Sequence, residues 1–127
     1  MGETPADKQI VLDLGVEGGG ATIFRTTLAS GRWEFHVEGS SMDMDENDDE
    51  VWRSWESPPY ISIEEAIQSI SKGGDWVLFY PRFVHPDYRT AVWELVQKTV
   101  QRRRLYDKKT WTDVRREWWR KLCHPEL

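Results

Sequence analysis

The pattern that most constrains this chain is an alternation of apolar and polar residues in its first third. Apolar side chains occupy every second position from Ile10 to Leu14 and from Trp33 to Val37, as is typical of β-strands with one buried face. The segment between them, residues 21–28, is rich in Thr and Ile, which favour strands. Turns that contain glycine separate the three segments. The pattern predicts an antiparallel three-stranded meander.

The region after the meander predicts a helix and a further strand. Ser62 and Glu65 have the spacing of a capping box, in which both side chains satisfy free N–H groups at a helix start. Apolar residues continue at helical spacing through 63–70, so we expect a helix of about three turns. Residues 76–80 are continuously apolar, as is typical of a strand buried on both faces, and we expect a central strand at 75–80.

Two more helices are predicted in the last third of the chain. Pro86 suits the first position of a helix and Asp87 favours its positive end, so a helix should run from there to about Arg104. A cap at Thr110 precedes a last helix over residues 111–122. We therefore expect an α+β fold, a mainly antiparallel sheet with about three helices packed on one face.

Length and composition predict one domain in a reducing compartment. A chain of 127 residues can bury one modest core, which we place at residues 9–122, with a flexible leader at 1–8 and a tail at 123–127. The single cysteine, Cys123, allows no internal disulfide. Residues 1–8 lack the pattern of a secretory signal, and no apolar run is long enough to span a membrane. We expect a cytoplasmic protein with no membrane partner.

An acidic segment with Met and Trp residues is the strongest candidate for function. Six of the eight residues from Asp43 to Glu50 are carboxylates, so we expect a solvated loop over residues 39–50 and a short strand after it. Charge could steer a basic partner to this segment, and the apolar side chains could anchor it. An ordinary solvated loop is the alternative. The predicted partner-binding residues are Met42, Asp43, Met44, Asp45, Asp48, Asp49, Glu50, Trp52 and Trp55.

The charge distribution is uneven, and the basic part offers a second candidate. Residues 1–80 have a net charge of −11, whereas residues 81–127 have a net charge of +6. Basic side chains mixed with Trp can hold nucleic acid, although the negative charge of the whole chain opposes this. The predicted nucleic-acid contacts are Arg102, Arg103, Arg104, Lys108 and Lys109.

Two motifs in the chain resemble a group of small, uncharacterised bacterial proteins. One is the Leu12–Gly19 segment, which reads as hxxGxEGG with h apolar, and the other is the Pro81–Arg89 segment with its VHPxxR pattern. The group has no known activity, so the resemblance implies a small bacterial fold and no mechanism. It directs attention to Glu17, His85 and Arg89, which could meet in one polar cluster.

These observations favour a binding protein over an enzyme. The leading hypothesis is a small acidic domain of the immunity or inhibitor type that blocks a basic protein partner. The first alternative is a nucleic-acid accessory protein that uses the basic C-terminal helices. The second is an enzyme built around the Glu/His/Arg cluster. We expect no cofactor, and no metal site because Cys and His lack metal-binding spacing.

Overall fold

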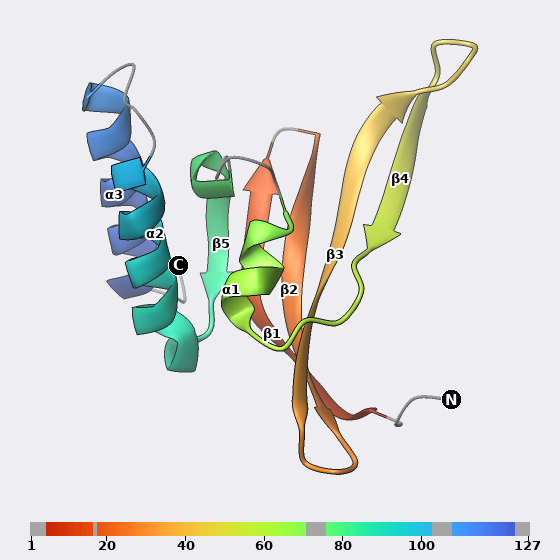
Figure 1. The fold of residues 1–127 in the computed structure, drawn as a ribbon. Helices are drawn as coiled ribbons and strands as arrows, with labels where there is room; N and C mark the ends of the chain where they lie inside the picture. Colours follow the sequence, from red (N-terminus) through yellow and green to blue (C-terminus); the bar gives the residue numbers. More distant parts are fainter. Residues whose placement is uncertain (1–4, 17, 71–75, 103–107, 124–127) are drawn as a thin grey trace.

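The computed structural model describes residues 5–16, 18–70, 76–102 and 108–123, and it consists of a five-stranded antiparallel sheet with three α-helices (Figure 1). The strand order is β4-β3-β2-β1-β5. The α+β class and the N-terminal meander are thus confirmed. The strands are β1 (Pro5–Val16), β2 (Gly19–Leu28), β3 (Trp33–Met44), β4 (Glu50–Glu56) and β5 (Tyr80–Val84). The helices are α1 (Ile63–Gln68), α2 (Arg89–Arg102) and α3 (Lys108–Cys123), and a 3₁₀ turn, η2 (Pro86–Tyr88), precedes α2.

The meander directs one set of side chains into the core and the alternate set to solvent. Leu12, Ile23 and Val37 lie opposite one another across β1, β2 and β3, and all three are buried. We call the face of the sheet that carries these buried side chains the inner face, and the opposite face the outer face. The two predicted turns include Gly18 and Gly31, both with positive φ, as tight hairpin turns require. β1 begins at Pro5, so residues 5–8, expected in a leader, belong to a strand that pairs with β2.

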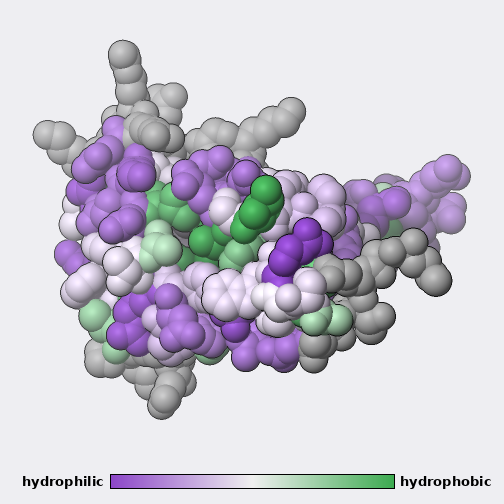
Figure 2. Space-filling view, turned by 60° about the horizontal axis from the view of Figure 1, so that its bottom comes forward, coloured by the Kyte–Doolittle hydropathy of each residue, from purple (hydrophilic) through white to green (hydrophobic). Residues whose placement is uncertain are grey.

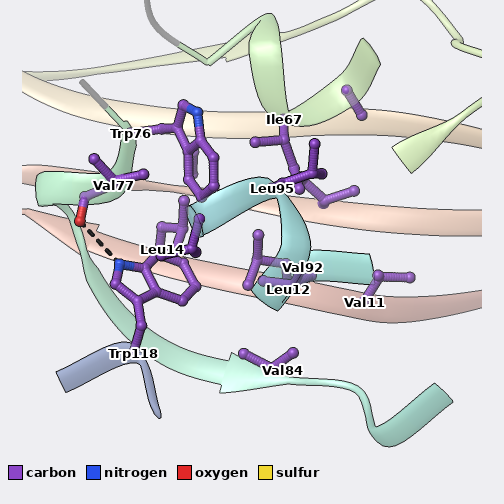
Figure 3. Packing of buried hydrophobic residues seen from close by; sticks show 14 of the residues in the cluster. Val11, Leu12, Leu14, Ile67, Trp76, Val77, Val84, Val92, Leu95 and Trp118 are labelled. Atoms are coloured by element: carbon purple, nitrogen blue, oxygen red, sulfur yellow. Dashed lines mark hydrogen bonds between the residues drawn. The ribbon is translucent and has the colours of Figure 1, made fainter. Parts of the chain in front are cut away.

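The helices cover the inner face and complete the core. They contribute buried side chains from α1, α2 and α3 to one hydrophobic cluster with the sheet. Near its centre the rings of Trp76 and Trp118 meet edge to face, with centroids 5.6 Å apart. The Trp118 indole N–H donates a hydrogen bond to the Val77 carbonyl O at 2.9 Å (Figure 3). A buried Trp needs such a partner for its only polar atom.

The central strand predicted at 75–80 is wrong in position, because the strand in this region is formed by the residues that follow. Residues 76–78 form a 3₁₀ turn, and the strand, β5, begins at Tyr80 and is an edge strand beside β1. The run is apolar because Trp76 and Val77 are buried against the helices. Such a short apolar run does not distinguish a buried turn from a strand. Pro81 is tolerated inside β5 because an edge strand leaves one row of backbone donors unused.

The predicted loop at 39–50 is also wrong, because most of it is strand. β3 continues to Met44, and β4 returns from Glu50. Carboxylate repulsion disfavours burial of these residues, but it does not prevent an exposed two-stranded ladder. The helix start at Ser62 is confirmed, since its Oγ accepts the Glu65 N–H at 3.2 Å, but α1 has only six residues. The last helix begins at Lys108, so Thr110 lies inside it and is not its cap.

Candidate functional site: the β3–β4 arm and the outer groove

The β3–β4 hairpin extends beyond the rest of the sheet (Figure 1). The register of β2 with β3 ends at the pair Gly19–Ser41, and the Met42 N–H then donates to the Gly18 carbonyl O at 2.7 Å. From there to the turn, β3 is paired with β4 alone. We call residues 42–52 the arm. In Figure 2 it is the hydrophilic projection on the right, away from the apolar patch at the centre of the view.

One aspartate orders the turn at the end of the arm. The Asp45 Oδ1 accepts the N–H groups of Asn47 and Asp49 at 2.8 and 2.9 Å. The Asp45 N–H also donates to the Asp49 carbonyl O at 3.0 Å, and Asp48 adopts a φ of 61°. Aspartate favours such turns because its side chain can replace a backbone acceptor. Asp45 therefore orders the turn, and its contact with a partner stays a prediction.

The two faces of the arm separate the predicted partner-binding residues. Met42 lies opposite Trp52, and Met44 lies opposite Glu50, so these four side chains share the outer face. Met42, Met44 and Trp52 are 41%, 52% and 65% exposed. Asp43 alternates to the other face, where its Oδ2 lies 3.0 Å from the Arg53 Nε. The outer face of the arm is therefore an exposed apolar strip beside an acidic turn.

Trp55 alternates away from Trp52, although both residues line the same groove on the sheet. It lies opposite Gly39, and a Cβ on Gly39 would overlap the Trp55 indole ring. Only glycine at position 39 thus lets the ring lie against the neighbouring strand. Trp55 is still 41% exposed, so it can add apolar surface at the base of the arm.

The outer face continues from the arm into a groove of about 780 Å³. Trp52 lies at the arm end of this groove, and the floor is formed by small residues of β2, β3 and β4, which leave the backbone uncovered. The charged residues that line it are Glu38, Glu56 and Arg82, none of which the sequence pattern had indicated as a site. The alternation in β3 does place Glu38 on the polar face, but a groove depends on how neighbouring strands assemble.

The Glu38 carboxylate of the groove has two close nitrogen partners. The Glu38 Oε2 lies 2.8 Å from the Lys8 Nζ and 3.0 Å from the His36 Nε2. These contacts, the Lys8 hydrogen bond foremost, lower the pKa of Glu38 below its ordinary value. The Glu56 Oε1 lies 3.7 Å from the same His36 nitrogen. At the other side of the groove, the Arg82 Nη2 contacts the Asp13 Oδ1 at 3.3 Å.

The predicted Glu/His/Arg cluster does not receive support as a catalytic site. Glu17 lies outside the described residues. His85 acts as the cap of η2, where its Nδ1 accepts the Asp87 N–H at 3.1 Å, and Arg89 begins α2. The His85 N–H donates to the Val11 carbonyl O at 2.8 Å.

The basic residues predicted to contact nucleic acid lie where the two long helices end and begin. Arg102 ends α2, and Lys108 and Lys109 begin α3, while Arg103 and Arg104 lie outside the described residues. The described parts of these helices include an aromatic pair of which one ring, Trp119, is exposed and the other, Trp93, is half-buried. The rings of Trp93 and Trp119 are 5.0 Å apart, and Trp119 is 53% exposed.

Comparisons with protein-family models, curated proteins and solved structures found no match. Within the described ranges, no three His, Cys, Asp or Glu side chains are placed to hold a metal ion together. No helix in the described part of the chain is both long and apolar enough to cross a membrane.

Proposed function

We propose that this chain is a cytoplasmic protein-binding domain of the inhibitor or immunity type, which docks a basic partner through the outer face of the β3–β4 arm. The observation that carries the proposal is the register of the arm. It gathers Met42, Met44 and Trp52 on one exposed face beside the acidic turn. Exposed Met and Trp side chains with a charged rim are the composition of a binding surface.

The energetics of the arm also favour a covered state. A two-stranded ladder is at best marginally stable in water, and this one is held by the Asp45 turn and the Asp43–Arg53 pair. The Asp43 and Arg53 side chains are both more than half exposed, so their ion pair contributes little. The exposed apolar surface of Met42 and Trp52 is unfavourable in water, and a bound partner would remove this surface from solvent.

The first test changes the charge of the arm while keeping its fold. The arm variant combines Glu46→Gln, Asp48→Asn, Asp49→Asn and Glu50→Gln, and leaves the structural residues Asp43 and Asp45 in place. The control variant makes the same charge change elsewhere, with Asp7→Asn, Glu34→Gln, Glu64→Gln and Glu94→Gln. Tagged proteins are used to capture partners from nuclease-treated host lysate, and the captured protein is then purified for kinetics.

The purified partner should associate with the arm variant about tenfold more slowly than with the control variant at low salt. The difference should shrink as salt is raised, because exposed charges are screened. Trp52→Ala should raise the Kd about 30-fold, as loss of a central aromatic anchor does, and Trp119→Ala should leave it unchanged. Equal binding by the arm and control variants would show that the arm is only a solvated hairpin.

Nucleic-acid binding is the second candidate, and the exposed Trp119 ring, which contacts the half-buried Trp93 on the basic helices, is the observation in its favour. Bases can stack on aromatic rings that lie next to cations. Nucleic acid or protein that is captured from an untreated lysate and lost after nuclease treatment would support this second candidate. Binding should then fall steeply with salt and be lost in the Arg102/Arg103/Arg104→Ala variant, while the arm variant should bind normally.

A further inference from the structure

The free edge of β4 presents backbone groups that point away from the sheet. The Ser57 N–H donates to the Val37 carbonyl O, and the Asp45 N–H donates to the Asp49 carbonyl O, so the hydrogen-bonded pairs of this ladder include positions 51, 53 and 55. In an antiparallel pair the residues between them direct their N–H and C=O groups outward. These residues are Trp52, Ser54 and Glu56.

β4 has only one of the features that usually protect an edge strand, its charged side chains Glu50, Arg53 and Glu56. Natural edges are blunted by charged side chains, proline, bulges or a covering helix. The β3–β4 register has no shift from Glu38–Glu56 to Met44–Glu50, and the sequence of β4 contains neither Pro nor Lys. The opposite edge strand, β5, contains Pro81, has a register shift against β1 and packs against α3. The contrast indicates that the β4 edge is available for a further strand.

We propose that an extended segment of the basic partner adds to β4 as a sixth strand of the sheet. The inference rests on the proposed function and specifies how the partner is recognised. Residues 43–56 contain seven carboxylates and one arginine, so a second copy of this chain would bring like charges together, whereas a basic segment is attracted. In strand addition the main chain supplies affinity and alternate side chains supply specificity.

The outer groove determines which side chains the added strand should carry. A residue directly opposite Ser54 would have its side chain on the same face as Ser54, Trp52 and Glu56. There the Glu56 carboxylate and the Trp52 ring lie at the groove, with the ionised Glu38 beside them. A Lys or Arg at this place gains both a carboxylate and an aromatic face. The partner segment should therefore have Lys or Arg at alternate positions.

A synthetic peptide of alternating Lys and Val, with blocked ends, tests the pairing directly. It is titrated by calorimetry against the full chain at about 50 mM salt, where surface charges act over more than 10 Å. We expect the added strand to be antiparallel to β4, so that Lys residues on the outer face direct their backbone N–H groups toward β4. Methylation of the backbone amide nitrogens of the Lys residues should then weaken binding roughly tenfold or more, while methylation of the backbone amide nitrogens of the Val residues should not. Equal effects of the two methylation patterns overturn strand addition.

A matched pair of protein variants gives an independent readout. Ser54→Pro removes an outward N–H and keeps every charge, whereas Ser54→Ala keeps the N–H. The Pro variant should bind the peptide roughly tenfold more weakly than the Ala variant, and wild-type amide exchange at Trp52 and Ser54 should slow when the peptide binds. Wild-type self-association that Ser54→Pro abolishes would assign the edge to a second copy and overturn the proposal.

The proposed function and the strand addition fail separately. If the arm variant loses the captured partner but Ser54→Pro retains it, the acidic docking surface stands and strand addition is wrong. If Ser54→Pro loses the partner and the arm variant retains it, backbone pairing stands and charge docking is wrong. Absence of peptide binding overturns strand addition alone, because the proposed function is judged on the captured protein.

Discussion

The indole of Trp118 gives the sharpest test of how the helices are fixed to the rest of the fold. The side chain is 1% exposed, its N–H donates to the Val77 carbonyl O at 2.9 Å, and its ring meets the edge of Trp76. Trp118→Phe keeps an aromatic ring in the core and removes the N–H donor. The change therefore probes the hydrogen bond between α3 and the 76–78 turn together with a small loss of volume.

The expected loss follows from these two contributions. A buried carbonyl left without its donor costs about 1–3 kcal/mol. The smaller ring leaves unfilled space that costs about 1 kcal/mol more. The free energy of unfolding should therefore fall by about 2–4 kcal/mol. For a denaturant slope of about 2 kcal/mol per M of urea, the midpoint should fall by about 1–2 M.

Urea unfolding followed by far-UV circular dichroism measures this loss without relying on tryptophan emission. Trp119→Phe is the control, because it is the same chemical change at the next residue of α3, on a side chain that is 53% exposed. Its only described ring partner is Trp93, so it should cost less than about 1 kcal/mol. Similar losses in the two variants, or a loss under about 1 kcal/mol for Trp118→Phe, would refute the reasoning.

Three further predictions concern the arm and the outer face. Asp45→Ala removes the carboxylate that accepts two N–H groups of the turn, so amide exchange should speed up across the arm while the urea midpoint changes little. Glu38 has a lowered pKa, chiefly through Lys8, so its ionised form adds stability above the unfolded-state pKa, and this is lost as pH falls through the lowered value. The thermal midpoints of Glu38→Gln and wild type should thus differ at neutral pH and converge in acid. Gly39→Ala should displace the Trp55 ring, costing about 1–3 kcal/mol, and an unchanged crystal position of that ring would contradict the packing.

Much of the fold is local in origin, and the sequence alone predicted it. The alternation at Trp33–Val37 follows from the two-residue period of a strand. The helix cap depends only on the Ser62 hydroxyl and an N–H group three residues later. Both predictions were correct because a residue's nearest neighbours along the chain decide them. The same holds for the turns at Gly18 and Gly31, where backbone conformation favours glycine.

The errors occurred where a pattern had two explanations. Residues 76–80 are apolar because Trp76 contacts Trp118, 42 positions later, and no local signal contains that contact. The acidic run at 43–50 predicted a loop from charge, but its strands are set by the register of β3 against β4 and by the Asp45 turn. Repulsion between carboxylates limits burial, and an exposed ladder buries little.

The candidate site also combines features that are local in the sequence with features that depend on the tertiary structure. Sequence alone determined that Met, Trp and carboxylates are concentrated in residues 42–55, because composition is local. Only the tertiary structure decided that Met42, Met44 and Trp52 share one face, that Asp43 and Trp55 do not, and that β4 ends the sheet. The physical reason is that side-chain facing depends on register and an open edge depends on strand order. Both are set by contacts between segments that are distant in the chain.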